Sequence, residues 1–160
     1  MITVQNDPSG EYAMSLVEFA DWLEDKTVPL GFQFDYREKS WTVIPGPKGT
    51  QKVQRSLENG KFMTLEFRFP EDSQDVIVQL VLVDGLVTTL ERVLVGIGKF
   101  LPERPSIREL VEIAGVSSST AHKYVQRLRK LGLLYPRREG YKDRDINLTE
   151  TGLTVLEALT

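Results

Sequence analysis

Hydrophobic residues recur along this chain of 160 residues with two different spacings. In residues 61–69 they alternate with polar residues, which is the spacing of a half-buried β-strand. From Leu86 onward they recur every three or four residues, which is the spacing of an amphipathic helix. The pattern therefore predicts an α+β fold, with one domain in residues 1–85 and a second, mostly helical domain in residues 86–160.

The first half of the chain predicts a helix packed on an antiparallel sheet. Ser15 is followed three residues later by Glu18, a capping box that should begin the helix. Four or five strands should follow as a meander, with Asn59-Gly60 as the turn of one hairpin. Residues 76–83 are apolar on both faces and should therefore form a central strand of this sheet.

Aromatic residues are frequent in this half, and two interpretations of them stay open. They can fill the core of a small domain, which is the more common use of such side chains, or they can line a ligand pocket. A pocket would suit a sensor, and dimerisation or docking of a partner are the other roles open to residues 1–85. The aromatic residues in question are Phe32, Phe34, Tyr36, Trp41, Phe62, Phe67 and Phe69.

The second half contains two short helices separated by a tight turn. Ser106 and Glu109 form a second capping box, so the first of these helices should begin at the next residue, Ile107. Gly115 supplies the left-handed conformation that ends this helix. One of the serines that follow can then cap a helix over residues 118–131. This order of helix, turn and helix is typical of proteins that read DNA.

The second of these helices has two faces of opposite character. Ala121, Val125 and Leu128 lie within a narrow arc at about 100° per residue and should be buried. Side chains on the opposite face could hydrogen-bond base edges or hold phosphates, because an α-helix fits the major groove. That face and its flanks carry Ser119, His122, Lys123, Gln126, Arg127 and Lys130.

A hairpin is predicted after this helix. Residues 134–148 contain two short strands around a polar turn at Gly140, and Thr149 should cap a final helix. Basic residues cluster near the tip of the hairpin, where they could contact phosphate or the minor groove. With two residues of the preceding helix they make up the predicted phosphate contacts, which are Arg127, Lys130, Arg137, Arg138, Lys142 and Arg144.

A resemblance to the winged helix-turn-helix of the LexA-type repressors lies in one stretch, PSIRELVEIAGVSSSTAHKYVQRLRKLGLL. The matching parts are the Pro-Ser-Ile-Arg-Glu entry, the Gly-Val-Ser-Ser-Ser-Thr turn, the His that follows it and the Arg-Leu-x-Lys-x-Gly-Leu exit. The resemblance implies that residues 118–130 enter the major groove and that base contacts come from Ser118, Ser119, Thr120, His122, Lys123 and Gln126. A self-cleaving peptidase domain follows the DNA-binding domain in those repressors. This sequence leaves no room for one after the motif, so DNA binding is expected and self-cleavage is not.

Composition argues against several kinds of site. Cys is absent and His122 is the single His, so disulfides, Cys-based redox chemistry and multi-histidine metal sites are excluded. No nucleophile motif such as G-x-S-x-G occurs, so we expect neither an enzyme nor a cofactor. The longest apolar run, residues 76–83, is far too short to span a membrane, and no signal-peptide pattern precedes it. We therefore expect a cytoplasmic protein.

Charge is distributed unevenly along the chain. The net charge is −3, which by itself argues against a nucleic-acid partner. However, residues 1–85 carry 8 Lys/Arg and 14 Asp/Glu, a net charge of −6, whereas residues 86–160 carry 12 and 9, a net charge of +3. Such an asymmetry indicates that one half meets phosphate and the other does not.

Together these features predict a sequence-specific transcriptional regulator, of the repressor type by resemblance, that binds double-stranded DNA. A homodimer is expected because one recognition helix reads few base pairs. A small-molecule or protein effector could act at residues 1–85. Two alternatives stay open: a winged-helix module for protein interaction or assembly, and an initiator of replication or plasmid maintenance.

Overall fold

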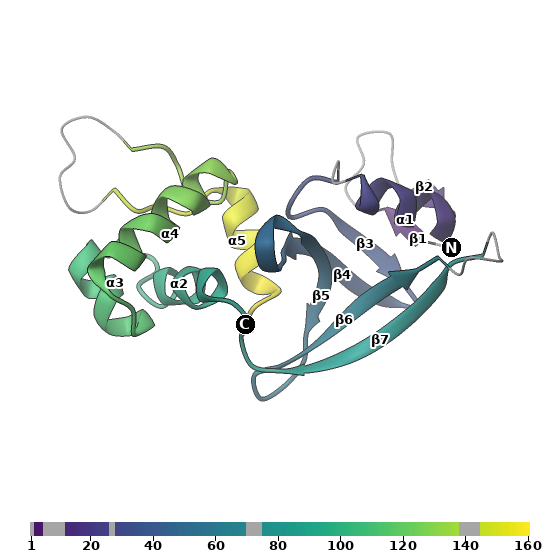
Figure 1. Cartoon of the computed structure of the whole chain (residues 1–160), viewed down its shortest axis with the longest axis horizontal. Helices are drawn as coiled ribbons and strands as arrows, with labels where there is room; N and C mark the ends of the chain where they lie inside the picture. Colours follow the sequence, from purple (N-terminus) through teal and green to yellow (C-terminus); the bar gives the residue numbers. More distant parts are fainter. Residues whose placement is uncertain (1, 5–11, 26–27, 70–74, 138–144) are drawn as a thin grey trace. The chain divides into compact units, whose positions relative to one another are not determined.

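The computed structural model describes residues 2–4, 12–25, 28–69, 75–137 and 145–160. They form two compact units, Met1–Gly85 and Leu86–Thr160 (Figure 1). The first unit is built mainly of strands and the second of helices. The predicted α+β fold class is therefore confirmed.

The first unit is a helix on an antiparallel sheet with the strand order β2-β1-β3-β4-β5-β6-β7. Sequence patterns predicted four or five strands, and the two that they missed are the three-residue strands β1 and β2, which are too short to show a period. The elements are β1 Ile2–Val4, β2 Tyr12–Met14, α1 Leu16–Glu24, β3 Gln33–Tyr36, β4 Lys39–Pro45, a 3-10 turn η1 Pro47–Gly49, β5 Gln51–Ser56, β6 Lys61–Arg68 and β7 Ile77–Asp84.

Helix α1 covers one face of this sheet and forms the core with it. The helix begins where predicted, because the Ser15 hydroxyl accepts a hydrogen bond from the Glu18 backbone N–H at 3.1 Å. Phe19 is fully buried, and its ring lies 4.5 Å from that of Phe34 and 5.5 Å from that of Phe67, measured between centroids. Aromatic contacts at these separations stabilise the packing beyond the burial of apolar area alone.

Most of the aromatic residues of this half belong to the core, which confirms the more common of the two interpretations for them. Phe34, Tyr36 and Trp41 are buried in the cluster under α1, and Phe32 and Phe67 pack against it. Two residues lie elsewhere. Phe62 is buried on the opposite face of the sheet, since it neighbours Met63 of the α1 face along β6, and Phe69 is 41% exposed beyond the end of the strand.

Strand β7 lies at the edge of the sheet, so the prediction that residues 76–83 form a central strand was wrong. Of the described strands only β6 pairs with it, through eight consecutive residue pairs. A strand that is apolar on both faces can occupy the centre of a sheet, but the pattern does not report how many neighbours it has. Here the chain leaves the sheet after β7 and continues into helix α2, Thr89–Gly98. The side of β7 that faces away from β6 therefore receives no further strand from the described chain.

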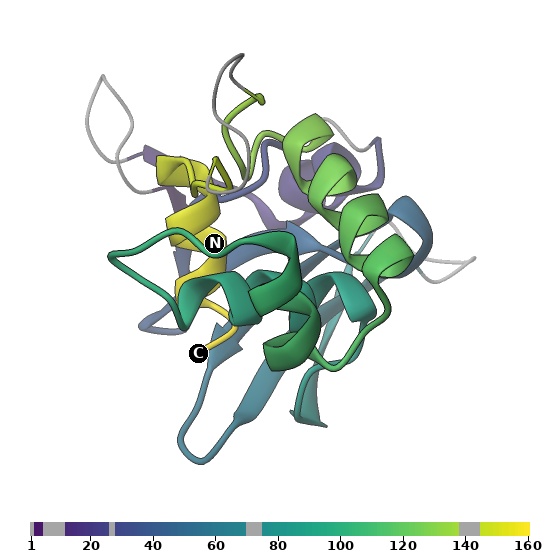
Figure 2. The same ribbon diagram turned by 90° about the vertical axis from the view of Figure 1, so that its left-hand side faces the viewer.

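The second unit contains four helices, counted over its described residues (Figure 2). Helices α2, α3 and α4 contact one another, and α5 packs on α2. Their inward side chains are buried, among them Leu94 of α2, Leu110 of α3 and Leu128 of α4, which are all fully buried. The bounds are α2 Thr89–Gly98, α3 Ile107–Ala114, α4 Ser118–Lys130 and α5 Glu150–Glu157.

The hairpin between α4 and α5 is described at its base and not at its tip. The two arms meet through a bridge between Leu134 and Leu148, and the Tyr135 N–H donates to the Asn147 carbonyl at 2.9 Å. Thr149 caps α5 as predicted, since its hydroxyl accepts from the Gly152 N–H at 3.0 Å. The predicted tip, residues 138–144, lies outside the described residues. We call this hairpin the wing.

Candidate nucleic-acid interface

A three-residue turn joins α3 to α4. Ser106 and Glu109 form the predicted capping box at the start of α3, with two reciprocal hydrogen bonds of 3.1 and 3.2 Å. Gly115 ends α3 with φ 66° and ψ 39°, the left-handed conformation that glycine adopts without strain. Ser117 then caps α4, because its hydroxyl accepts from the Thr120 N–H at 3.2 Å. Local hydrogen bonds and the left-handed Gly115 thus define where α3 ends and α4 begins.

The exposed side of α4 is the face predicted from the sequence. Ala121 and Leu128 are fully buried and Val125 is 3% exposed, so one side of the helix is held in the unit's core. Thr120 is half-buried, and the other residues predicted to contact DNA from this helix are exposed. These exposed residues are Ser118, Ser119, His122, Lys123, Gln126, Arg127 and Lys130.

Three hydroxyl groups at the start of α4 are connected to one another. The Ser117 hydroxyl donates to the Thr120 hydroxyl at 2.8 Å and lies 3.2 Å from that of Ser119. The Thr120 side chain is therefore bonded to the serine that caps the helix, while Ser118 and Ser119 stay on the exposed surface. Capping and base contact can coexist at a helix start, but this arrangement gives Thr120 a structural function first.

Two cations of α4 pack over one aromatic ring. The Lys123 Nζ lies 5.8 Å and the Arg127 Cζ 5.3 Å from the centroid of Tyr124, which is half-buried. Cation–π contacts of this length hold a charged group at a defined position on the surface. Both charged groups therefore lie along one flank of the helix, beside Tyr124.

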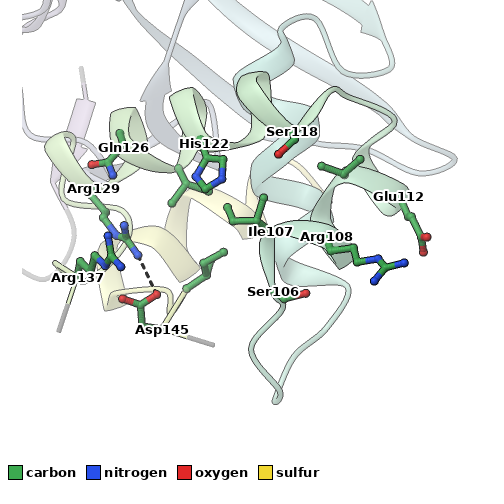
Figure 3. Close-up of a pocket in the computed structure, with 13 residues that line it drawn as sticks. Ser106, Ile107, Arg108, Glu112, Ser118, His122, Gln126, Arg129, Arg137 and Asp145 are labelled. Carbon is green, nitrogen blue, oxygen red and sulfur yellow. Dashed lines mark hydrogen bonds and ion pairs between the residues drawn. The ribbon is translucent and has the colours of Figure 1, made fainter. Parts of the chain in front are cut away.

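A groove of about 890 Å³ runs along the other flank of α4 (Figure 3). It lies between α4, the first turns of α3 and the base of the wing. The polar residues that helix α4 contributes to its wall are Ser118, His122, Gln126 and Arg129. The polar residues from α3 and the wing are Ser106, Arg108, Glu112, Arg137 and Asp145.

One buried ion pair joins α4 to the wing. The Arg129 Nη2 lies 3.2 Å from the Asp145 Oδ1, and the two side chains are 12% and 8% exposed. The Arg129 Nε also donates to the Tyr135 carbonyl at 3.3 Å. Figure 3 shows this pair beside Arg137, at the end of the groove. Because Tyr135 and Asp145 belong to different arms of the wing, one arginine holds both arms.

The site predicted from the sequence did not include Arg108, Arg129 or Asp145. Arg108 carried a usable signal, since it lies off the apolar stripe of α3 in its first turn and is exposed there. The ion pair between Arg129 and Asp145 left no signal in the sequence, because the two residues are sixteen positions apart and belong to elements of different type. Of the predicted wing residues, Arg137 is exposed, whereas Arg138, Lys142 and Arg144 lie outside the described residues.

The described residues hold no group of three or more His, Cys, Asp or Glu side chains that could bind a metal ion. Over the same residues, no helix is long and apolar enough to cross a membrane.

Comparison with known proteins agrees with the geometry of this unit. The family model of the IclR helix-turn-helix domain matches residues 101–138. A LexA repressor of Oenococcus oeni is 41% identical over 69 residues, which cover 38% of this chain and 32% of the repressor. The chain thus spans about a third of the length of that relative. No solved structure matches the chain. These matches confirm a winged helix-turn-helix DNA-binding domain similar to that of LexA-type repressors.

Proposed function

We propose that the chain is a sequence-specific transcriptional regulator that binds double-stranded DNA, with α4 in the major groove and the wing on the phosphate backbone or in the minor groove. The observation that carries this proposal is the division of α4 into a buried apolar face and an exposed face of hydrogen-bonding and basic side chains. The winged helix-turn-helix likeness of residues 101–138 supports the same use of the helix.

Base contacts would come from the exposed face of α4. Gln126 can bond the N6 and N7 of adenine with two hydrogen bonds, and Lys123 can bond the O6 and N7 of guanine. His122 and Ser118 line the groove beside α3, so they would meet base edges on that flank. Ser119 lies near the start of the helix, the part that contacts bases in helix-turn-helix proteins. Thr120 would contribute mainly through its hydrogen bonds with Ser117, the residue that caps α4.

Phosphate contacts would come from basic side chains around this face. Arg127 and Lys130 are exposed on α4, and Arg137 is exposed on the first arm of the wing. We assign the same role to Arg138, Lys142 and Arg144. Contacts of this kind contribute affinity that falls steeply with salt and carries little sequence information.

Arg129 would take no part in binding DNA, although it lies on α4 and is basic. Its guanidinium is engaged by Asp145 and by the Tyr135 carbonyl, and its side chain is 12% exposed. We therefore assign Arg129 the role of positioning the wing relative to the recognition helix.

Selection of genomic fragments by the purified chain tests this function. Fluorescence anisotropy would then compare the selected site with a scrambled duplex over a series of salt concentrations. The proposal predicts a shared motif, a steep loss of affinity with salt, and binding to the selected site about 10³-fold tighter or more. Weak binding without sequence preference would instead favour a protein-interaction module. Clustered repeats of the motif would favour an initiator of replication.

A further inference from the structure

Strand β7 presents apolar side chains at an edge of the sheet that no other described strand covers. Leu80 pairs with Leu65 and Leu82 with Met63, so both lie on the face that α1 covers. They are nevertheless 43% and 53% exposed, and Ile77 on the opposite face is 54% exposed. Three large apolar residues of one strand therefore stay in solvent.

Some backbone groups of the same stretch also have no partner strand among the described residues. Gly85 N–H donates to the Gly60 carbonyl at 3.0 Å, which makes this pair a hydrogen-bonded one. Bonded and non-bonded pairs alternate along an antiparallel ladder, so the pairs formed by residues 77, 79, 81 and 83 of β7 are bonded to β6. The N–H and C=O groups of Val78, Leu80 and Leu82 consequently point away from β6.

This edge lacks the usual features that prevent strand pairing. Natural sheets protect an edge by shortening it, by bulges, or by placing Pro or charged residues on it. Edge strand β2 has three residues, whereas β7 has eight in continuous register with β6. From Ile77 to Val83 it contains neither Pro nor a charged residue, and its one charged residue, Asp84, stands at its end. An edge of this length and composition is suited to accept another strand.

We propose that β7 pairs antiparallel with β7 of a second copy of the chain, and that this seam is the dimer interface of the regulator. The inference rests on the proposed function, because a regulator with one recognition helix per chain needs a second copy to read a two-fold site. It assigns to residues 1–85 the role of joining two DNA-binding domains.

Two-fold pairing fixes which residues meet. A strand that pairs with its own copy, face for face, must place one residue opposite itself, and that self-pair is hydrogen-bonded when the backbone groups of the residue point away from β6. Among the residues whose backbone groups point away from β6, Leu80 is nearest the middle of β7. With Leu80 at the centre, Leu80 pairs with Leu80 of the other copy and Val78 pairs with Leu82. The alternative centre at Val81 would move Asp84 opposite Val78, into the apolar stripe. The Leu80 centre keeps Asp84 opposite Val76, at the end of the seam.

Charge also favours this edge as the surface that joins two copies. Residues 1–85 carry a net charge of −6, so most surfaces of this unit would repel their own copy. In the Leu80-centred register, residues 77–83 of one copy lie opposite uncharged residues of the other. Val76 lies opposite Asp84. The seam therefore brings together two acidic units without placing one carboxylate directly opposite another.

The size of the seam sets its strength. Eight residues of strand are about 26 Å long, in a sheet about 10 Å thick, so the contact is smaller than the roughly 800 Å² per partner of a standard interface. The pairing should therefore be weak in solution. Two adjacent half-sites on DNA would stabilise it, because they hold both copies at a high effective concentration.

Disulfide formation by Leu80→Cys tests the register directly. The chain has no Cys, so any disulfide must join two copies. Residues opposite one another in a hydrogen-bonded pair have Cα atoms about 5.5 Å apart, which suits a disulfide. We expect Leu80→Cys to cross-link at least about tenfold faster than Val17→Cys, a control that is 37% exposed on α1. Equal rates for the two variants would overturn the seam.

A charge-pairing experiment separates this inference from the proposed function. Leu80→Lys and Leu80→Glu should each abolish cooperative binding to a two-half-site duplex, because like charges then face each other. An equimolar mixture of the Lys and Glu variants should restore cooperative binding, because opposite charges then face each other. Each variant alone should bind a duplex with a single half-site as tightly as the unmodified chain does. Cooperativity that survives in Leu80→Lys alone would overturn the seam. Absence of any DNA binding by the unmodified chain would contradict the proposed function, and the cross-linking rates would still decide the seam.

Discussion

Arg129 and Asp145 connect helix α4 to the wing through an ion pair of 3.2 Å between Nη2 and Oδ1. Both side chains are largely buried, and Arg129 also bonds the Tyr135 carbonyl on the other arm of the hairpin. The second oxygen of Asp145 is buried and has no hydrogen-bond partner among the described residues. The carboxylate therefore depends on Arg129, and removal of either partner leaves a buried charge or a buried polar group uncompensated.

Asp145→Ala should destabilise the second unit by about 3 kcal/mol, because the buried guanidinium of Arg129 loses its counter-charge. Urea denaturation, monitored by circular dichroism at 222 nm, measures this loss of stability, because most of the helical residues belong to the second unit. Trp22 and Trp41 both lie in the first unit, so their fluorescence reports that unit separately. Glu157→Ala, at an exposed position of α5, is the control.

The double variant Arg129→Leu with Asp145→Leu distinguishes charge from packing. Apolar residues in place of both members remove the uncompensated charge, so the double variant should lose less stability than Asp145→Ala alone. A double variant that is less stable than either single variant would show that packing around these side chains dominates.

Gly152→Ala should destabilise the chain, although the same change stabilises most helices by about 1 kcal/mol. A Cβ at this position of α5 would overlap the backbone carbonyl of Leu133, whose carbon lies 3.0 Å away. Backbone cannot move aside as a flexible side chain can, so we expect a loss of about 2 kcal/mol. Thermal unfolding measures it, with Thr151→Ala as the neighbouring control. An increase in melting temperature would contradict the close approach of α5 to Leu133.

Features with a local cause were predictable from the sequence, and features that depend on distant partners were not. The capping box of Ser106 and Glu109 and the turn at Gly115 each involve residues at most four apart, and both have the predicted form. The position of β7 was predicted wrongly, because edge and centre differ in the number of neighbouring strands and not in the strand's own pattern. The pairing of Arg129 with Asp145 depends on tertiary contact alone.

Lys130→Ala should weaken binding to selected and scrambled DNA alike. Lys130 is exposed on α4, and loss of one phosphate contact should reduce the slope of log affinity against log salt by about 1. Anisotropy titrations at several salt concentrations measure this slope. Lys39→Ala removes the same charge from an exposed position of the first unit and should leave the slope unchanged. A loss restricted to the selected site would identify Lys130 as a base contact instead.

The most direct test of α4 as the reading element is the specificity profile of Gln126→Ala. Affinities for the selected site and for every single base-pair variant of it would be measured for this protein and for the unmodified chain. A recognition helix in the major groove predicts that discrimination falls by about 1–3 kcal/mol at one or two adjacent base pairs and is retained elsewhere. An unchanged profile, or an equal loss of affinity on all sequences, would contradict base readout by this face of α4.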